Sequence, residues 1–347
     1  MTLPRPPWAP VEGDIVTEAA LRRAPVDRGS DGESVIEVSG LTKHFPPDVT
    51  ALDGVSLTVR RGSVVGLLGH NGAGKTTILR HLAGLLAPTG GTVRVFGRDP
   101  LEHGAWVRRR LGMLPGTSIL DQRLTARENL RFAAELFDLP PDGLEDRIAA
   151  MLGALGLGDR LDEKVSGYSA GMRQRATLAK VLLTDPELLL LDEPSTALDP
   201  VAQRELRALI RRVSRDEGRT VVICTHDLAE AAALCDDVVI LARGQIVAEG
   251  NPSELAARAG HTAVDVEIAP DDERAALAAT EGRGTAALEG PGRLRLEGVG
   301  RTDVPGLLRD LVTAGVDVYR VEPRAGTLED LYLTLHAGAA RKIEERP

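Results

Sequence analysis

Runs of consecutive apolar residues alternate with amphipathic segments from about residue 35 to residue 257. The three clearest apolar runs are at 64–68, 188–191 and 221–223. Uninterrupted runs of this kind are typical of strands in a parallel sheet that is covered on both faces. Residues 112–162, between the first two runs, are expected to be helical, and Thr125-Ala126-Arg127-Glu128 matches a capping box that opens a helix. The pattern predicts an α/β domain with a helical insertion.

A change of pattern after residue 258 predicts a second, smaller domain. Strands are indicated by alternating polar and apolar residues, and helices by wider apolar spacing. The expected strands are at 264–268, 294–297 and 316–321, the expected helices are at 271–280 and 303–313, and a cap at 327–330 opens a last helix. We assign these elements to a small α+β ferredoxin-like domain, whose order is β-α-β-β-α-β, a fold that many unrelated functions share.

The first 34 residues differ from both predicted domains. They are rich in proline, glycine, aspartate and arginine without helical or strand periodicity, so we expect a flexible tail. They also lack the charged start and apolar stretch of a signal peptide, which predicts a cytoplasmic protein. The predicted division is a tail at 1–34, an α/β domain at 35–257 and an accessory domain at 258–347, in keeping with about two domains for 347 residues.

Composition narrows the class of protein further. No uninterrupted apolar run reaches the roughly 18 residues that a membrane-spanning helix needs, so a membrane role would require a partner protein. The net charge of -9 argues against general nucleic-acid binding, because neutralising phosphates needs a concentrated basic surface. The only cysteines, Cys224 and Cys235, are too few for a disulfide framework or a zinc site. We expect both to be buried or incidental thiols.

A glycine-rich sequence follows the first apolar run and precedes a helical pattern that begins at Thr77. It matches the phosphate-loop pattern G-x-x-x-x-G-K-[ST] completely, with the residues Gly69, His70, Asn71, Gly72, Ala73, Gly74, Lys75 and Thr76. The glycines let backbone N–H groups turn toward phosphate oxygens, Lys75 supplies a positive charge to the β- and γ-phosphates, and Thr76 can place its hydroxyl on Mg²⁺. The loop and Thr77 therefore predict a site for ATP and Mg²⁺, against the alternative of a glycine-rich turn that binds nothing.

Two acidic residues end the second apolar run, and a histidine ends the third. Ligands of open α/β sheets bind at the carboxyl ends of the strands, so these side chains are expected near the phosphate loop. Asp192 is placed to hold Mg²⁺ or its water, and Glu193 to orient and polarise the attacking water. His226 emerges at the same sheet edge and can contact the γ-phosphate. Acids after an apolar strand, or a single histidine, are more often structural, and their pairing with the phosphate loop makes the assignment catalytic.

The order of these motifs resembles the P-loop NTPases called ATP-binding-cassette (ABC) ATPases over nearly all of residues 35–257. The most diagnostic stretch is Tyr-Ser-Ala-Gly-Met-Arg-Gln-Arg at 168–175, which resembles the family's signature loop, commonly Leu-Ser-Gly-Gly-Gln. Ser169 and the N–H groups around Gly171 open a helix whose positive end can face a γ-phosphate, which in the family is held by the other subunit. The alternative for this stretch is an ordinary helix cap.

The same resemblance implies further site residues. Phe45 resembles the aromatic residue that stacks on adenine, residues 195–199 the loop that crosses the dimer interface, and His226 the switch histidine. One departure follows the strand at 112–115, where most members carry a glutamine and this chain has Gly116. The usual glutamine contact to Mg²⁺ is therefore in doubt, and Gln122, a water ligand or a backbone contact are the alternatives.

Gly116 and the signature stretch together resemble the ATP-binding subunits of type-2 exporters, the group that includes sodium and polyketide-drug export systems. Those subunits often carry a small C-terminal domain that ends near a Thr-Leu-Glu-Asp stretch, as this chain does at 327–330. The resemblance implies a homodimer that binds two ATP molecules, each between the Lys75 loop of one protomer and the Ser169 loop of the other. It would drive a separate integral membrane permease through the helical insertion, at the cytoplasmic face of the cell membrane.

The rival hypothesis is a soluble ABC ATPase that acts on the ribosome or on DNA. Against it stand the single cassette, the acidic charge balance and the lack of a long coiled-coil insertion or basic arms. We therefore expect no specific nucleic-acid partner. For the C-terminal domain, the alternatives are stabilisation of the dimer and binding of a regulator.

Overall fold

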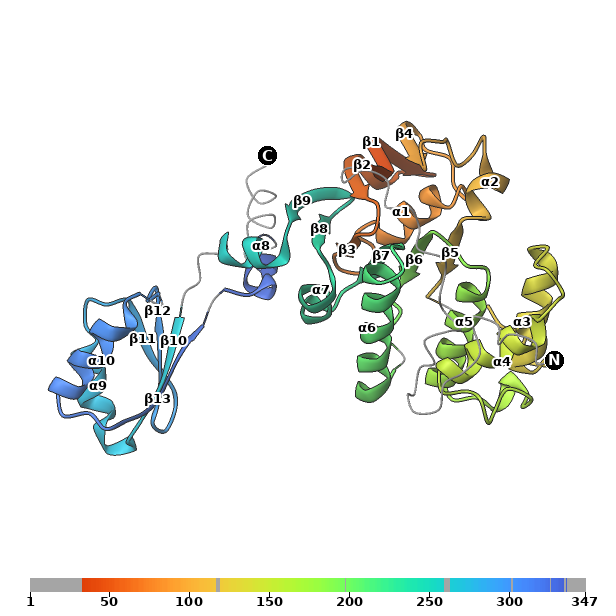
Figure 1. The fold of residues 1–347 in the computed structure, drawn as a ribbon. Helices are drawn as coiled ribbons and strands as arrows, with labels where there is room; N and C mark the ends of the chain where they lie inside the picture. Colours follow the sequence, from red (N-terminus) through yellow and green to blue (C-terminus); the bar gives the residue numbers. More distant parts are fainter. Residues whose placement is uncertain are drawn as a thin grey trace. The chain divides into compact units, whose positions relative to one another are not determined.

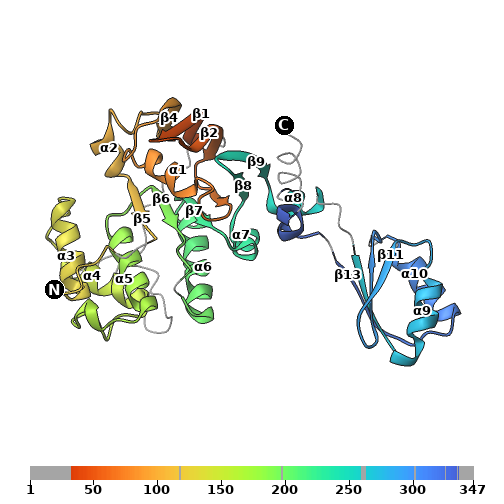
Figure 2. The same cartoon turned by 180° about the vertical axis from the view of Figure 1, so that it is seen from behind.

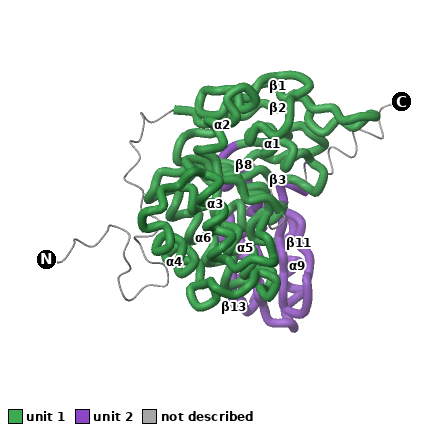
Figure 3. Tube along the Cα trace, turned by 90° about the vertical axis from the view of Figure 1, so that its right-hand side faces the viewer, with its two compact units in different colours: residues 1–249 green, residues 250–347 purple. Residues whose placement is uncertain are grey.

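The computed structural model describes residues 33–335, apart from 117–118, 197, 259–262, 301, 325 and 334. The chain forms two compact units that divide between Glu249 and Gly250 (Figure 3). The tail expected at 1–34 lies outside the described residues except for its last two, and Ser34 already begins the first strand. The phosphate loop belongs to the first unit.

A six-stranded sheet with the order β5-β6-β7-β3-β8-β9 forms the centre of the first unit (Figure 1). Its strands are β3 (Val64–Leu68), β5 (Leu111–Leu114), β6 (Leu188–Asp192), β7 (Thr220–Thr225), β8 (Asp237–Ala242) and β9 (Gln245–Gly250). The neighbours from β5 to β8 are parallel. All residues of β3, β6 and β7 are buried, as the apolar runs predict for strands covered on both faces. The segments that follow these three strands therefore meet at one edge of the sheet.

A smaller antiparallel sheet with the order β2-β1-β4 completes the α/β core. Its strands are β1 (Ser34–Phe45), β2 (Val49–Arg60) and β4 (Gly90–Val95), and the core helices are α1 (Lys75–Leu82), α2 (Gly104–Arg108), α6 (Pro200–Arg215) and α7 (Leu228–Leu234). Ile78, Leu79 and Leu82 of α1 are buried in one apolar cluster with residues of both sheets. This packing fixes the start of α1, and with it the phosphate loop, against the large sheet.

The helical insertion lies between β5 and β6 along the chain. It contains α3 (Ala126–Leu136), α4 (Leu144–Ala154), a 3₁₀ turn (Val165–Gly167) and α5 (Ala170–Leu183), and its three α-helices form one group (Figure 2). The predicted capping box is confirmed, because Thr125 accepts from the backbone of Glu128, whose side chain accepts from the backbone of Thr125.

The expected start of the helical region at residue 112 is wrong. Residues 111–114 form strand β5, which pairs with β6. A four-residue apolar segment is too short to show whether its period is that of a strand or of a helix. Pairing with β6 decides in favour of the strand, which the family resemblance implied at 112–115. Helix α5 packs closely on it, since a Cβ at Gly112 would lie 2.7 Å from Val181.

The second unit contains a four-stranded antiparallel sheet with the order β11-β12-β10-β13. Its elements are α8 (Pro252–Arg258), β10 (Ala263–Ile268), α9 (Glu273–Ala279), β11 (Thr285–Gly290), β12 (Arg293–Glu297), α10 (Val304–Thr313) and β13 (Val318–Arg324). Buried residues that alternate along β10 and β12 form one core with Leu307 and Leu311 of α10. Helix α9 begins two residues later than expected, because Pro270–Asp272 form a 3₁₀ turn.

The expectations for the two cysteines and for membrane-spanning helices can be compared with the described residues. Cys224 and Cys235 are both buried free thiols. Within the part of the chain that the structure describes, no helix combines the length and the apolar character that crossing a membrane requires.

Candidate functional site

A cleft of about 410 Å³ opens at the carboxyl ends of β3, β6 and β7. Most of the predicted site residues line it, together with three residues from other parts of the core. The lining residues are Ala51, His70, Asn71, Gly72, Gly74, Lys75, Thr76, Thr77, Gly116, Asp192, Glu193, Thr196 and His226. The sheet therefore brings the phosphate loop, the two acids and the histidine to one place.

The phosphate loop turns tightly because its three glycines, Gly69, Gly72 and Gly74, adopt positive-φ conformations that other residues disfavour. Gly74 has a φ of 110°, and a Cβ there would lie 2.7 Å from Cδ2 of Leu52. Gly69 has a φ of 153°, and a Cβ there would lie 2.5 Å from the carbonyl oxygen of Leu241. Gly69 and the buried Ala73 shape the loop without lining the cleft. The turn presents the N-terminus of α1 to the cleft, where free backbone N–H groups and the helix dipole favour a phosphate group.

Lys75 is a buried cation whose hydrogen bonds go to neutral carbonyl groups. Its side chain is only 6% exposed, and Nζ donates to the carbonyl oxygens of Gly69 at 2.5 Å and of His70 at 3.3 Å. The distance from Nζ to Oε1 of Glu193 is 3.7 Å. Phosphate oxygens would give this ammonium group stronger, charge-assisted hydrogen bonds than the two neutral carbonyl groups do.

Thr76 and Asp192 place two hard oxygen atoms side by side in the cleft. Thr76 Oγ1 donates a hydrogen bond to Asp192 Oδ2 at 2.9 Å. Burial raises the pKa of the Asp192 carboxyl group, and the hydrogen bond from Thr76 opposes that rise. Hydroxyl and carboxylate oxygens beside a phosphate site are the ligands that Mg²⁺ prefers. The residues present therefore fit a magnesium ion.

Glu193 is held in a strained position at the mouth of β6. Its φ of 50° is in the left-handed region, which for a residue other than glycine costs on the order of 1–3 kcal/mol. Its N–H donates to the carbonyl oxygen of Cys224 at 2.9 Å, and its Oε2 lies 2.8 Å from Nδ1 of His226 and accepts from Thr196 Oγ1 at 3.2 Å. Its other oxygen, Oε1, is buried and has no hydrogen-bond partner. A carboxylate with one hydrogen-bonded oxygen and one oxygen that still lacks a hydrogen-bond partner can accept a proton from a ligand.

Besides Gly69 and Ala73, three predicted site residues lie outside the cleft lining. Phe45 ends β1, where its ring centroid is 5.1 Å from Lys43 Nζ. Ser169 is the N-cap of α5, and its Oγ accepts from the N–H of Met172 at 3.2 Å, while Gly171 lies in the first helical turn. Ser169 is exposed. The single chain therefore contains a capped helix start at the signature stretch but does not bring it to its own phosphate loop.

Gly116 lines the cleft at the position where the family resemblance led us to look for a glutamine. A Cβ at Gly116 would have one neighbour within 4 Å, the carbonyl oxygen of Asp192 at 3.8 Å. Gln122 is exposed and does not line the cleft, and its carbonyl oxygen accepts from the N–H of Ser166 at 3.0 Å. The structure therefore does not bring Gln122 to the metal position.

Sequence reasoning missed Ala51 and Thr196 as residues of the cleft. Ala51 comes from β2, and no motif marks it. Thr196 follows the two acids by a short turn and donates to Glu193, so its proximity to Glu193 was the available signal.

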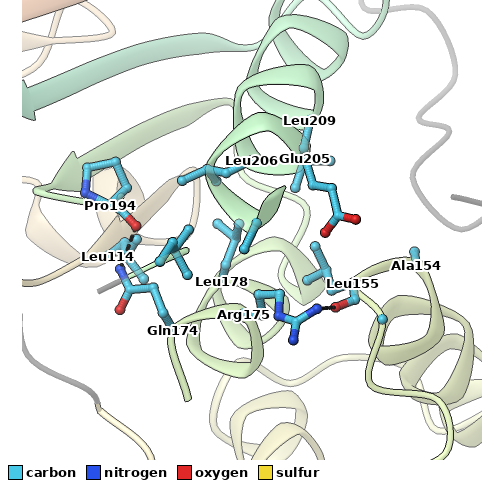
Figure 4. A pocket seen from close by; sticks show the side chains of 13 residues that line it. Leu114, Ala154, Leu155, Gln174, Arg175, Leu178, Pro194, Glu205, Leu206 and Leu209 are labelled. Carbon is cyan, nitrogen blue, oxygen red and sulfur yellow. Dashed lines mark hydrogen bonds between the residues drawn. The ribbon is translucent and has the colours of Figure 1, made fainter. Parts of the chain in front are cut away.

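A second, mainly apolar cavity of about 80 Å³ lies between α5 and α6 (Figure 4). Two hydrogen bonds cross its polar rim. Gln174 Nε2 donates to the carbonyl oxygen of Pro194 at 3.1 Å, and Arg175 Nη1 donates to that of Leu155 at 3.3 Å. The first of these bonds connects the signature helix α5 to the turn directly after Glu193.

Comparison with known proteins identifies the family. A model of the ABC transporter family matches residues 52–196. The chain is 36% identical over 315 residues to the daunorubicin resistance ATP-binding protein DrrA3 of Streptomyces coeruleorubidus, a match that covers 90% of this chain and 99% of that protein. It is 41% identical over 253 residues to a fluoroquinolones export ATP-binding protein of Mycobacterium tuberculosis, which covers 73% of this chain and 82% of the relative.

Solved structures agree with the sequence relatives. An ATP-binding subunit of an ABC transporter has a TM-score of 0.60 and 32% identity, and covers 65% of this chain and 92% of its own. The cbiO1 protein of Clostridium perfringens, part of the ABC transporter complex cbiONQ, has a TM-score of 0.59 and 27% identity, with 64% and 90% covered. With the phosphate loop, the paired acids and the histidine at one sheet edge, these likenesses show that the chain belongs to the ATP-binding subunits of ABC transporters, which hydrolyse ATP to power a separate permease.

Proposed function

We propose that this chain powers an exporter and works as a homodimer with two ATP molecules at its interface. One observation carries the proposal: Lys75, Asp192, Glu193 and His226 converge in one cleft, whereas Ser169 lies outside it at an exposed helix start. A second copy would supply that helix start to the phosphate in the cleft. The relatives named for daunorubicin resistance and fluoroquinolone export support the direction of transport.

The cleft residues divide the work on ATP among them. Lys75 and the N–H groups at the start of α1 would bind the β- and γ-phosphates, and Thr76 and Asp192 would hold Mg²⁺. Bound Mg²⁺ neutralises charge on the phosphate oxygens. Glu193 would orient the attacking water and take its proton on Oε1, the oxygen that has no hydrogen-bond partner. His226 would hold Oε2 of Glu193 and contact the γ-phosphate.

Phe45 is proposed as the adenine contact. It pairs with Val49 across β1 and β2, and Ala51, two residues along β2, lines the cleft. The ring is therefore close along the strand to the cleft wall without forming part of it. An adenine ring that extends from the phosphate loop toward β1 would meet Phe45 by stacking.

The remaining proposals concern organisation and location. We assign residues 35–257 to the ABC cassette and residues 258–347 to a ferredoxin-like accessory domain that stabilises the dimer. The 315-residue match to the daunorubicin resistance protein is longer than the first unit, so the likeness extends into the second. The protein would sit at the cytoplasmic face of the cell membrane, bound to its permease through the helical insertion, without a specific nucleic-acid partner.

Dimer formation is tested with Glu193→Gln, which should bind MgATP without hydrolysing it. Analytical ultracentrifugation should show a dimer with MgATP and a monomer without it. The double variant Glu193→Gln with Ser169→Arg should stay monomeric, because the bulky cation blocks the partner's phosphate, yet bind a fluorescent ATP analogue normally. A Glu193→Gln protein that stays monomeric in saturating MgATP would contradict the homodimer.

The partner is tested by affinity purification of the full chain from solubilised membranes. We expect a polytopic membrane protein to co-purify with it in stoichiometric amount. Co-sedimentation with ribosomes instead would support the rival role of a soluble ABC ATPase.

A further inference from the structure

Behind the cleft lies a buried carboxyl group that none of these roles uses. Glu230 is in α7, four residues after His226, and is only 1% exposed. Its Oε2 accepts hydrogen bonds from Ser195 Oγ at 2.9 Å and from Thr225 Oγ1 at 3.0 Å. Its Oε1 is buried without a hydrogen-bond partner. Burying a carboxyl group costs free energy unless hydrogen bonds compensate for the lost water, and here the two hydroxyl donors supply that compensation at Oε2 only.

The two hydroxyl groups that Glu230 accepts from flank the proposed catalytic residues. Ser195 comes two residues after Glu193, and Thr225 comes directly before His226. The Thr225 hydroxyl also accepts from the N–H of Asp227 at 3.0 Å, so hydrogen bonds secure the chain on both sides of His226. Glu230 thus joins the turn after β6 to the turn after β7.

The same turn after β6 is secured from the opposite side by the signature helix. Gln174 of α5 donates to the carbonyl oxygen of Pro194, the residue between Glu193 and Ser195 (Figure 4). Glu193 itself has a left-handed φ of 50°, and a strained backbone of this kind persists only where its surroundings over-determine it. The side chain of His226 is 59% exposed, so its own packing does little to fix it.

We infer that Glu230 is a positioning residue, whose carboxyl group links Ser195 to Thr225 and so keeps Glu193 and His226 at contact distance. The inference rests on the proposed roles of Glu193 and His226. It assigns Glu230 no contact with ATP. Its effect is on the geometry of the attacking water, for which a displacement of about 1 Å can cost roughly 100-fold in rate.

A matched control lies at the other end of β7. Glu217 is 7% exposed, and it also has a buried Oε1 without a hydrogen-bond partner. It accepts from Arg219 Nε at 2.8 Å and does not line the cleft. Replacing Glu217 therefore disturbs a comparable buried carboxyl group without touching the turns that carry Glu193 and His226.

The test compares Glu230→Leu, Glu230→Gln and Glu217→Leu in the full chain, with the ATPase rate normalised to folded protein. Glu230→Leu removes the carboxyl acceptor and puts an apolar side chain of similar size in its place. It should lower kcat at least about tenfold and change the KM for ATP by less than about twofold. Glu230→Gln keeps an acceptor oxygen and should restore kcat to within about threefold of wild type. Glu217→Leu should lower Tm and leave kcat within about twofold.

A double variant shows whether Glu230 acts through His226 or only stabilises the fold. In a His226→Ala background, Glu230→Leu should reduce the residual rate by less than about twofold more, because residues that act through one another are not additive. Should Glu230→Leu fail to fold, Ser195→Ala removes one donor and leaves the buried carboxyl group in place, and it should still lower kcat about threefold or more.

The outcomes separate the two levels of the proposal. Full turnover by Glu193→Gln would overturn the proposed role of Glu193. If Glu193→Gln loses turnover as expected, two results would overturn the positioning role alone. One is a kcat in Glu230→Leu that is no lower than in Glu217→Leu. The other is a loss of rate from Glu230→Leu that is as large in the His226→Ala background as in wild type.

Discussion

The two edges of the large sheet, at the amino and the carboxyl ends of its parallel strands, both hold buried charged groups, but they pair them differently. At the amino end, Arg219 is 2% exposed and donates to Glu217 and to Asp185 at 2.8 Å each, and to the carbonyl oxygen of Pro186 at 3.2 Å. At the carboxyl end, Lys75 donates to carbonyl oxygens, and its carboxylate contact to Glu193 is 3.7 Å long across a cleft. A charge enclosed by opposite charges at hydrogen-bond distance has no capacity left for a ligand, whereas a loosely paired one does.

The largest expected effect is at the carboxyl end. Glu193→Gln should lower kcat by about 100-fold or more, because the amide cannot take a proton from water. Tm should not fall, since the side chain is part of an open, strained site. Phosphate release and thermal unfolding measure the two quantities, and a large drop in Tm would show that Glu193 is structural after all.

The opposite result is expected at the amino end. Arg219→Met leaves the carboxyl group of Glu217 buried and without its cation, which should destabilise the first unit by about 3–5 kcal/mol. Urea unfolding measures that loss. The ATPase rate per folded molecule should remain that of wild type at temperatures where the variant is folded, and a selective fall in kcat would break the comparison between the two ends.

A smaller effect on the ATPase is expected from the Thr76 hydroxyl and Asp192 carboxylate oxygens in the cleft. Thr76→Val keeps the shape of the side chain but removes the hydroxyl beside Asp192. The Mg²⁺ concentration for half-maximal ATPase should rise roughly tenfold, equivalent to about 1.4 kcal/mol. High Mg²⁺ should recover most of the rate, and a loss of rate that Mg²⁺ does not recover would remove Thr76 from the metal site.

The smallest effect concerns pH. Burial raises the pKa of Glu230 above its ordinary value of 4.5. The folded protein therefore keeps this proton to higher pH than the unfolded chain does, so the associated stability is fully present below about pH 4.5 and is lost as the pH rises through the folded pKa. Glu230→Gln does not titrate. The Tm of Glu230→Gln minus the Tm of wild type should therefore increase as the pH rises above about 4.5. A Tm difference that does not change with pH would contradict the raised pKa of Glu230.

The sequence predicted the strands β3, β6 and β7 and the capping box at Thr125 because each depends on residues next to one another in the chain. Periodicity alone did not show β5, whose four residues are too short to show a period and are placed by their pairing with β6, and only the family resemblance implied a strand there. Sequence reasoning also missed Ala51 and Glu230, which no motif marks. Strand β2 brings Ala51 to the cleft from a distant part of the chain, and Glu230, although only four residues after His226, meets the turn after β6 through its tertiary contact with Ser195.

The sequence by itself determined the chemistry of the phosphate loop, since glycines, a lysine and a threonine at fixed spacing already define the turn and its charge. The order of the motifs, with the signature stretch at 168–175, indicated the family. Only the tertiary structure decided which charged groups lack a close partner of opposite charge and can bind a ligand. The contacts of Thr76 with Asp192, Lys75 with Glu193 and Ser195 with Glu230 join segments distant in the chain. They depend on how parallel strands align and on how deeply each group is buried, and local sequence does not set either of these.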